Sequence, residues 1–367
     1  MSGPASIYLN HAGTSWPKPI PVQRAVEAAM ASSPESWAAS FEAQHRAVAA
    51  AFGVDEPERL LLTPGCTSAL AVGIADQPWA PGDRVVTSAW EHHALLRPVL
   101  ALTERGVEHV IVPPGEGGAL FDLETFSSIL AEGRVRLVAV SAASNVTGAL
   151  LPIDAIAALA HEHGASVLVD AAQVAGWMPI DFDRMGVEIL AFAGHKGPQA
   201  PWGVGGLCMA PGAVFRSPRV DAEGRSWASE PGYCDTGSVD RLALAGLVAG
   251  LQWLAQAGPL DRLGRARAII DALAAGLARH PELEPLGPGA ADARVPTRAL
   301  RCRGRASRAW ARALAERGVI VSAGLQCAAL AHRTLGTLPT GVLRLSVGPQ
   351  TSAAIVDPVL AAVCAVG

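Results

Sequence analysis

Lysine is nearly absent from this chain, and one of its two lysines stands in an unusual setting. Lys196 follows an apolar run in the segment 192–206, FAGHKGPQAPWGVGG, where glycine and proline surround it; the other lysine is Lys18. An arginine side chain stays protonated, whereas a lysine amine can lose its proton and form an imine with a carbonyl compound. Lys196 is therefore a candidate covalent attachment point, the alternative being a solvated loop lysine.

Other polar residues follow apolar runs in a similar way. Asp170 closes the run SVLVD, where a carboxylate needs a cation or a proton donor because burying an unpaired charge is costly. Earlier in the chain, His92 and Asn145 each follow an apolar run, and Cys66 and Thr67 open a helix-like segment after RLLLTPG. The free amides at the start of a helix can bind a phosphate.

Together these groups match the needs of pyridoxal phosphate. This cofactor needs an anion site for its phosphate, an aromatic side chain against its ring, a carboxylate at its pyridine nitrogen and a lysine at its aldehyde. Each residue alone has an ordinary alternative, such as a helix cap or a packing histidine. Their appearance in one order along one sheet favours the cofactor.

The elements that must position these residues are short strands and helices in alternation. From about residue 59, aliphatic runs bounded by turn residues (RLLLT, RVVTSA, HVIVPP, VRLVAVSAASN, SVLVDAAQ, EILAFAGHK and GGLCMAP) alternate with helix-like segments such as PIDAIAALAHEHG. Runs of this kind predict a mostly parallel sheet covered on both faces, so the fold class is α/β. Ligands of such sheets bind at the carboxyl ends of the strands.

The pattern changes near residue 255 to an Arg- and Ala-rich helix, LDRLGRARAIIDALAAGLARH, followed by shorter elements. At 367 residues the chain is long enough for a large domain and a smaller one. We expect an N-terminal segment (1–20) that packs with the small domain, a large cofactor-binding domain (21–254) and a small C-terminal domain (255–367).

The sequence resembles the class V aminotransferase group of fold-type I pyridoxal-phosphate enzymes, and within it the cysteine desulfurases and selenocysteine lyases. The GHKG segment at 194–197 and VDAAQ at 169–173 are specific at this separation, and weaker similarities extend from YLNHAGTSWPKP to GVLRLSVGPQTS. The resemblance implies a large domain with a mostly parallel seven-stranded sheet and a smaller α+β C-terminal domain.

By this resemblance the site residues acquire roles. Lys196 would form the imine with pyridoxal phosphate and later move the α-proton of the substrate, Asp170 would pair with the pyridinium, and His92 would stack on the ring. The resemblance assigns the remaining cofactor contacts to Gln173 at the phenolic oxygen, Asn145 beside the ring, and Cys66, Thr67 and His195 at the phosphate. Asn10, His11, Asn145 and Arg344 would bind the substrate, with the Arg344 guanidinium on its carboxylate.

Cys327 lies in the segment GLQCAALAHRTLGT, where desulfurases carry the thiol that attacks the sulfur of the substrate. A thiolate is a suitable nucleophile for sulfur, and the implied reaction converts L-cysteine to L-alanine with a persulfide on Cys327 that passes to an acceptor. The alternative to a catalytic role is that Cys327 is an unreactive residue that packs as a small hydrophobic side chain. An aminotransferase, epimerase or C–S lyase for a specialised amino acid, and a sulfur-handling scaffold that turns over slowly, are competing readings.

Several positions depart from the usual family pattern. Ala193 replaces a hydroxyl residue two positions before the histidine of GHKG, and in the thiol segment Ser322 and Gln326 stand where arginine and histidine are common. His11 and Gly13 also differ from the usual residues near the N-terminus. These differences concern the substrate more than the cofactor, and whether cysteine, selenocysteine or a modified amino acid is the substrate stays open.

The composition of the chain gives no sign of a metal ion, a nucleic acid or a membrane as a partner. The six cysteines have no metal-ligand spacing, so no metal site and no disulfide framework are expected. A net charge of −4 and the lack of a lysine- or arginine-rich block give no sign of nucleic-acid binding. No apolar run is long enough to span a membrane and no secretory leader is visible, so we expect a cytoplasmic location.

In the resembled family a segment of the second subunit completes the phosphate site. Gly237 and Ser238 match that segment, which implies a homodimer.

Overall fold

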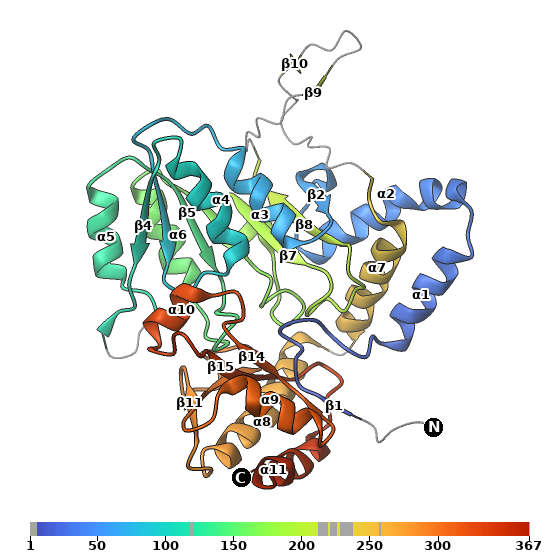
Figure 1. Ribbon diagram of the computed structural model, residues 1–367. Coiled ribbons are helices and arrows are strands. Elements are labelled where there is room, and N and C mark those ends of the chain that lie inside the picture. Colours follow the sequence, from blue (N-terminus) through green and yellow to red (C-terminus); the bar gives the residue numbers. More distant parts are fainter. Residues whose placement is uncertain are drawn as a thin grey trace.

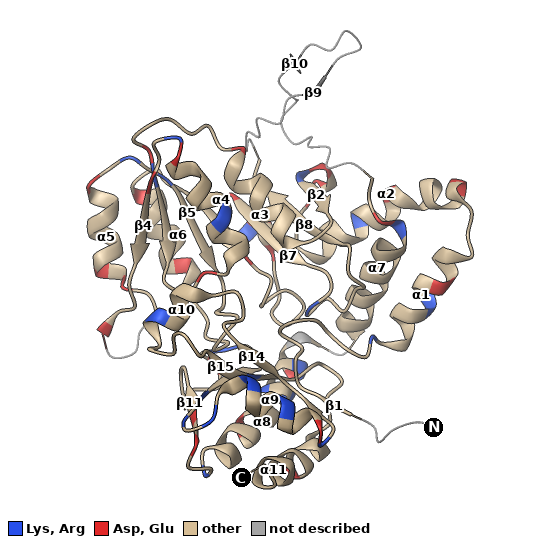
Figure 2. Ribbon diagram, in the orientation of Figure 1, with Lys and Arg blue, Asp and Glu red and all other residues tan. Residues whose placement is uncertain are grey.

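The computed structural model describes residues 6–116, 120–211, 219–220, 226–227, 238–256 and 258–366 of the chain. Figure 1 shows a large sheet surrounded by helices and a smaller C-terminal unit below it. No helix in these described ranges is both long and apolar enough to cross a membrane. In Figure 2, basic residues lie among acidic ones on the outer helices and at the ends of the sheet.

The large sheet has seven strands in the order β2-β8-β7-β6-β5-β3-β4. Strands β3 to β7 run parallel to one another, and β8 is antiparallel to both β2 and β7. The expected mostly parallel α/β sheet is therefore confirmed. The strands are Leu60–Thr63 (β2), Arg84–Ser88 (β3), Glu108–Val112 (β4), Val135–Ser141 (β5), Ser166–Asp170 (β6), Ile189–Ala193 (β7) and Gly205–Met209 (β8).

Both faces of the sheet are covered, which explains why its strands are apolar without alternation. Along β5, Val138 and Val140 join one buried cluster with residues of α5 and α6, while Leu137 and Ala139 join another with α3 and α4. Burying a valine or leucine side chain stabilises the fold by roughly 1.5–3 kcal/mol. The helices of this unit are Ile20–Met30 (α1), Pro34–Ala51 (α2), Cys66–Ala75 (α3), His93–Thr103 (α4), Leu123–Ala131 (α5), Ile153–Glu162 (α6) and Arg241–Gln256 (α7), with single turns at Pro57–Arg59 and Phe182–Arg184.

The smaller unit is built on an antiparallel sheet in the order β11-β12-β15-β14. Its strands are Leu283–Leu286 (β11), Thr297–Cys302 (β12), Ser322–Gly324 (β14) and Val342–Ser346 (β15). Its helices are Pro259–Leu277 (α8), Ser307–Ala315 (α9), Ala329–Thr334 (α10) and Val356–Cys364 (α11), with a turn at Ala353–Ile355. A short pair, β9 (Arg219–Val220) and β10 (Ser226–Trp227), is also formed.

The N-terminal segment joins the smaller unit. Strand β1 (Ile7–Tyr8) pairs in parallel with β13 (Val319–Ile320), Asn10 forms an isolated bridge with Ser346, and Leu9 lies in the buried cluster of α8, α9 and α11. From these contacts we propose that the N-terminal segment (1–20) packs with the small C-terminal domain (255–367), next to the large domain (21–254).

Candidate active site

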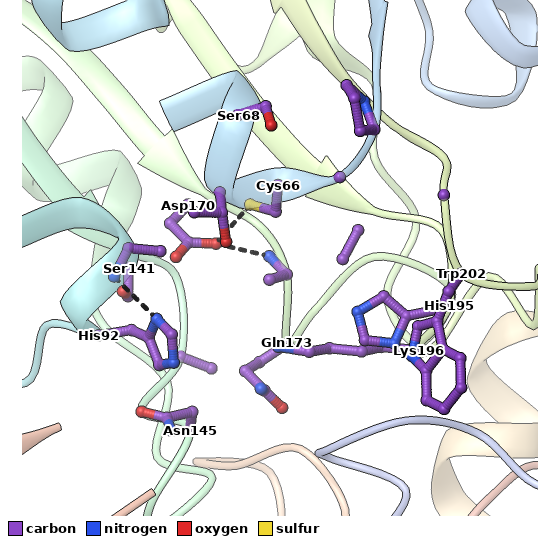
Figure 3. A pocket seen from close by; sticks show the side chains of 18 residues that line it. Cys66, Ser68, His92, Ser141, Asn145, Asp170, Gln173, His195, Lys196 and Trp202 are labelled. Atoms are coloured by element: carbon purple, nitrogen blue, oxygen red, sulfur yellow. Dashed lines mark hydrogen bonds between the residues drawn. The ribbon is translucent and has the colours of Figure 1, made fainter. Parts of the chain in front are cut away.

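A cavity of about 280 Å³ lies at the carboxyl ends of the parallel strands, where the α/β rule predicts a ligand site. Figure 3 shows its side chains around one open space, with Cys66 and Asp170 on one side and His195, Lys196 and Trp202 on another. Of the residues proposed from the sequence, the lining includes Cys66, Thr67, His92, Asn145, Asp170, Gln173, His195 and Lys196.

The turn between β2 and α3 forms the anion-binding side of the cavity. α3 begins at Cys66 after Gly65, and the first amides of a helix have no acceptor within the helix itself. Strand β8 approaches this turn so closely that a Cβ at Gly205 would lie 2.8 Å from the Cα of Gly65. The glycine of β8 thus allows the turn to sit against the sheet, with the helix start directed at the cavity.

Asp170 ends β6 with a nearly buried carboxylate, 6% exposed. Its Oδ1 accepts hydrogen bonds from the backbone N–H of Ala172 at 2.9 Å and from the Cys66 thiol at 3.4 Å. Both of these hydrogen bonds go to Oδ1, and none to Oδ2 is formed within the described part of the chain. This oxygen is therefore available to a protonated nitrogen of a ligand.

His92 caps helix α4 and presents a neutral ring to the cavity. Its Nδ1 accepts the backbone N–H of Ala94 at 3.0 Å, so the ring proton is on Nε2. Burial first, and then the charge of Lys196, lower its pKa to about 4. An uncharged, flat imidazole at this place is suited to stacking on an aromatic ring.

Lys196 lies in the turn after β7, and the N-terminal segment holds that turn. The carbonyl oxygen of His195 accepts the backbone N–H and the hydroxyl of Ser15, both at 3.0 Å, and the Nζ of Lys18 at 3.1 Å. Burial lowers the pKa of Lys196, while the charge of Asp170 acts in the opposite direction. A lowered amine pKa increases the neutral, nucleophilic fraction of the side chain.

Close backbone packing also fixes the Lys196 turn. A Cβ at Gly197 would lie 1.9 Å from the carbonyl oxygen of Ala175, so only glycine fits there. The turn after β7 is thereby pressed against the turn after β6, which carries Gln173. The glycine after the lysine in the GHKG segment thus has a steric reason.

Arg344 approaches from the smaller unit and is 4% exposed. Its Nη1 donates to the carbonyl oxygen of Asn145 at 2.7 Å and its Nη2 to Oδ1 of Asn10 at 2.9 Å. The Nε of Arg344 and the Oδ1 of Asn145 are buried without a protein partner among the described residues. These unpartnered groups suit a ligand with both acceptor and donor atoms.

Five of the proposed residues lie outside the cavity lining; two of them, Asn10 and Arg344, bind one another next to the lining residue Asn145. Cys327 is exposed in the loop between β14 and α10, but it is close enough to Lys196 and Arg344 to interact with them electrostatically. His11 packs instead against Tyr8, with ring centroids 5.0 Å apart, and against Gly348. Ser238 is exposed ahead of α7, and its expected partner-subunit role stays a prediction; Gly237 lies outside the described residues.

Sequence reasoning missed the lining residues Ser68, Ser141 and Trp202, and it also missed Glu91, which lies next to His92. The Glu91 side chain is fully buried and accepts hydrogen bonds from the Ser88 hydroxyl, the Ser141 hydroxyl at 2.6 Å and the Ser141 N–H at 2.9 Å. It joins the ends of β3 and β5 beside His92. Glu91 stands three residues after the end of β3, so it carries a weaker form of the signal that identified Asp170.

Three partly buried histidines predict acid sensitivity of the cofactor-free protein. The pKa values of His11, His92 and His195 are each lowered from 6.5 to about 4, mainly by burial. Between pH 6.5 and 4 the unfolded chain therefore binds more protons, so the free energy of unfolding falls as the pH is lowered through this window, by at most roughly 3 kcal/mol per histidine. Glu91 opposes this in part, because burial raises its pKa to about 7.

Urea unfolding at pH 7, 5.5 and 4 checks this expectation. His11→Asn should reduce the loss between pH 7 and 4, since it removes one of the three groups without touching the cavity. Equal stability of the wild-type protein at pH 7 and pH 4 would contradict the assignment.

Comparison with known proteins gives the family. The model of the family Aminotransferase class-V matches residues 22–359. A probable cysteine desulfurase of Pseudomonas aeruginosa is 33% identical over 324 residues, covering 84% of this chain and 78% of that protein. A probable cysteine desulfurase of Mycolicibacterium paratuberculosis is 28% identical over 313 residues, and there the match spans 81% of this chain but only 45% of the relative.

The crystal structure of the cysteine desulfurase CsdA from Escherichia coli superposes with a TM-score of 0.88 at 25% identity, covering 98% of this chain and 94% of that one. The similarity thus includes both the large sheet and the smaller unit. The resemblance carried by the GHKG and VDAAQ segments is confirmed: the chain belongs to the Aminotransferase class-V family.

Proposed function

We propose that the protein is a pyridoxal-phosphate-dependent cysteine desulfurase that converts L-cysteine to L-alanine. Relatives in two bacteria carry the name probable cysteine desulfurase, and CsdA, a cysteine desulfurase, shares the fold over nearly the whole chain. The observation that carries the proposal is the position of the Cys327 loop, which comes from the smaller unit and reaches the cavity: the carbonyl oxygen of Cys327 accepts the backbone N–H of His93 at 2.8 Å, next to His92 of the lining.

The residues of the cavity fit the cofactor. The start of α3 suits its phosphate, the free Oδ2 of Asp170 suits a protonated pyridine nitrogen, and the neutral ring of His92 suits stacking. The unpartnered Nδ1 of His195 offers a further polar contact on the same side as Lys196. Lys196, as an amine with a lowered pKa, would hold the cofactor covalently through its aldehyde.

When bound, pyridoxal phosphate supplies an electron sink for bonds at the α- and β-carbons of an amino acid. The protein supplies the rest. The Asp170 carboxylate would hold a proton on the pyridine nitrogen, and Lys196 would take or return a proton at the α-carbon of the substrate. Gln173, whose Nε2 donates to the carbonyl oxygen of Ala12 at 3.2 Å, lines the cavity between the two and would contact the phenolic oxygen of the cofactor.

Arg344 and Asn10 would bind the substrate. The Arg344 guanidinium still has an unused Nε–H and is held by Asn10 and Asn145, so it is oriented before a carboxylate arrives. Pre-orientation lowers the entropy lost on binding. His11 has a supporting place beside Tyr8 and Gly348 rather than a contact with the cavity, so we assign it no direct substrate contact.

The sulfur-transfer step balances without an added oxidant or reductant. The Cys327 thiolate attacks the sulfur of the substrate, the Cβ–S bond breaks, an S–S bond forms on Cys327, and the electron pair of the broken bond ends with a proton on the β-carbon of alanine. The net change is L-cysteine plus enzyme thiol to L-alanine plus enzyme persulfide. A protein or small thiol then accepts the sulfur.

We further propose a homodimer in the cytoplasm. The indole of Trp202 lines the cavity yet is 70% exposed, and Trp16, next to Ser15 whose hydroxyl donates to the carbonyl oxygen of His195, is 50% exposed. Such apolar side chains at the mouth of a site are suited to contact with a second subunit, which would bring Ser238 toward the phosphate. A nucleophile that must stay a thiol is suited to a reducing compartment.

Product analysis tests the proposed function. Purified protein loaded with pyridoxal phosphate and given L-cysteine and a reductant should release L-alanine and sulfide in equal amounts, measured by amino-acid analysis and a sulfide assay. Pyruvate with ammonia would instead indicate a C–S lyase, and a keto acid with aminated cofactor would indicate an aminotransferase. Either result, or no product from L-cysteine, would overturn the proposal.

A further inference from the structure

The loop that carries Cys327 has an unusual backbone. Gln326 and Cys327, neither of them glycine, both adopt left-handed conformations with φ of 42° and 55°. Side chains disfavour this region, and two consecutive residues persist in it only where the surrounding contacts hold them. The loop between β14 and α10 is therefore held in shape by something other than its own preference.

Part of the hold comes from two backbone carbonyls. The Nδ2 of Asn145 donates to the carbonyl oxygen of Gln326 at 2.8 Å, and the backbone N–H of His93 donates to the carbonyl oxygen of Cys327 at 2.8 Å. Both donors belong to the large domain and stand in or next to the candidate active site. The orientation of two successive peptide groups is thereby fixed against the site.

The side chain of Gln326 makes the other hydrogen bonds that fix this loop. Its Nε2 donates to the carbonyl oxygen of Val342 at 3.4 Å, on the strand that also carries Arg344. Its Oε1 lies 3.2 Å from Nε2 of His332, a residue of α10 that is fully buried. Because an amide oxygen only accepts, His332 must donate here.

The other ring nitrogen of His332 completes the assignment. Nδ1 lies 2.8 Å from the Thr337 hydroxyl, which donates to it when Nε2 carries the only ring proton. Every polar atom of this buried imidazole then has a partner. This fully buried histidine thus connects the Gln326 side chain to Thr337, beyond the end of α10.

We propose that His332 is a positioning residue for sulfur transfer, which acts through Gln326 to present the Cys327 thiol to the substrate in a fixed, left-handed loop. This inference rests on the proposed function. It assigns no direct contact with substrate or cofactor to His332. Release of Gln326 would let two peptide groups relax toward ordinary φ values and displace the thiol from Lys196 and Arg344.

Hydrogen exchange gives a readout of the loop that does not depend on turnover. His93 is the first residue of α4, so its amide has no acceptor within the helix and is protected by the Cys327 carbonyl. In Gln326→Ala and His332→Leu, exchange at the His93 amide should become at least tenfold faster, on the order expected for a lost local hydrogen bond. Exchange in β5 and β6 should be unchanged.

Kinetics with L-cysteine tests the positioning role. In both variants kcat for alanine formation should fall by on the order of 10²-fold, as for a misplaced reacting group, while KM stays within about threefold because Arg344 and Asn10 are retained. His332→Gln keeps a donor and should restore most of kcat. Since His332→Leu alters a fully buried site, Gln326→Ala, on the half-buried loop, decides the outcome if the leucine variant does not fold.

His109→Gln is the matched control. His109 is also bonded to a threonine hydroxyl, at 2.9 Å from Thr87, but it is only partly buried and lies in β4, away from the loop. It should leave kcat and the His93 exchange rate unchanged. An equal loss of kcat in this variant would overturn the proposal.

The outcomes separate this inference from the proposed function. If the wild-type protein forms no alanine, the proposed function fails, and the exchange rate at His93 still tests the hold on the loop. If the wild-type protein is active and Gln326→Ala keeps both kcat and the His93 exchange rate within twofold of the wild type, the positioning role of His332 is wrong. Faster exchange with unchanged kcat would also overturn it, because the loop would then be held without consequence for sulfur transfer.

Discussion

Lys196→Ala is expected to lower turnover of L-cysteine by on the order of 10⁴-fold or more, the upper end for a positioned acid–base group. The side chain lies at the cavity, burial lowers its pKa, and Asp170 and Cys66 are close enough to interact with it. Its loss removes both the covalent attachment of the cofactor and the proton carrier at the α-carbon. Alanine formation and the visible absorbance of the cofactor-loaded protein measure the two effects.

Two variants separate chemistry from charge. Lys196→Arg keeps the positive charge but cannot give a neutral amine, so it should be as inactive as the alanine variant. Lys18→Met, at the only other lysine, removes one of the donors to the His195 carbonyl and should retain covalent attachment at Lys196. A Lys196→Arg variant with more than one tenth of wild-type activity would contradict the role of the amine.

Cys327→Ser should abolish desulfuration, with a loss of at least about 10³-fold, while the cofactor still binds. A hydroxyl is a far poorer nucleophile toward sulfur than a thiolate, and serine keeps nearly the same size in the left-handed loop. The cavity residues that would hold the cofactor are untouched, since Cys327 is exposed and outside the lining. Alanine formation should vanish although L-cysteine still perturbs the absorbance spectrum.

Cys364→Ser is the control for this change. Cys364 is also an exposed free cysteine, but it ends α11 on the smaller unit. It should retain full activity. Unchanged alanine formation in Cys327→Ser would remove the thiol from the mechanism and favour the competing view, an aminotransferase or lyase in which Cys327 has no role.

The local pattern of the chain was sufficient to predict the large sheet and the positions of its polar residues. Runs such as VRLVAVS and SVLVD are apolar because helices cover both faces, and Asp170 and Lys196 stand out because a strand of this kind has few reasons to end in a charge. The direction of β8 could not be predicted in this way. A strand buried on both faces has the same apolar sequence pattern whether it runs parallel or antiparallel to its neighbours.

The long-range contacts of the site were beyond local reasoning. Arg344 binds the carbonyl of Asn145, 199 residues earlier, and no periodicity encodes such a pair. His11 has the residue type of a substrate ligand, yet it fills the space beside Gly348, where a Cβ would lie 2.3 Å from its ring. His332 sits in an ordinary helical pattern, and only its burial beside Gln326 reveals a task.

Borohydride reduction of the protein after incubation with pyridoxal phosphate tests the central claim most directly. The account predicts a stable phosphopyridoxyl label on one residue, Lys196, identified by peptide mass spectrometry, and loss of that label in Lys196→Arg. A protein that stays colourless and unlabelled, or one labelled only at Lys18, would contradict the account.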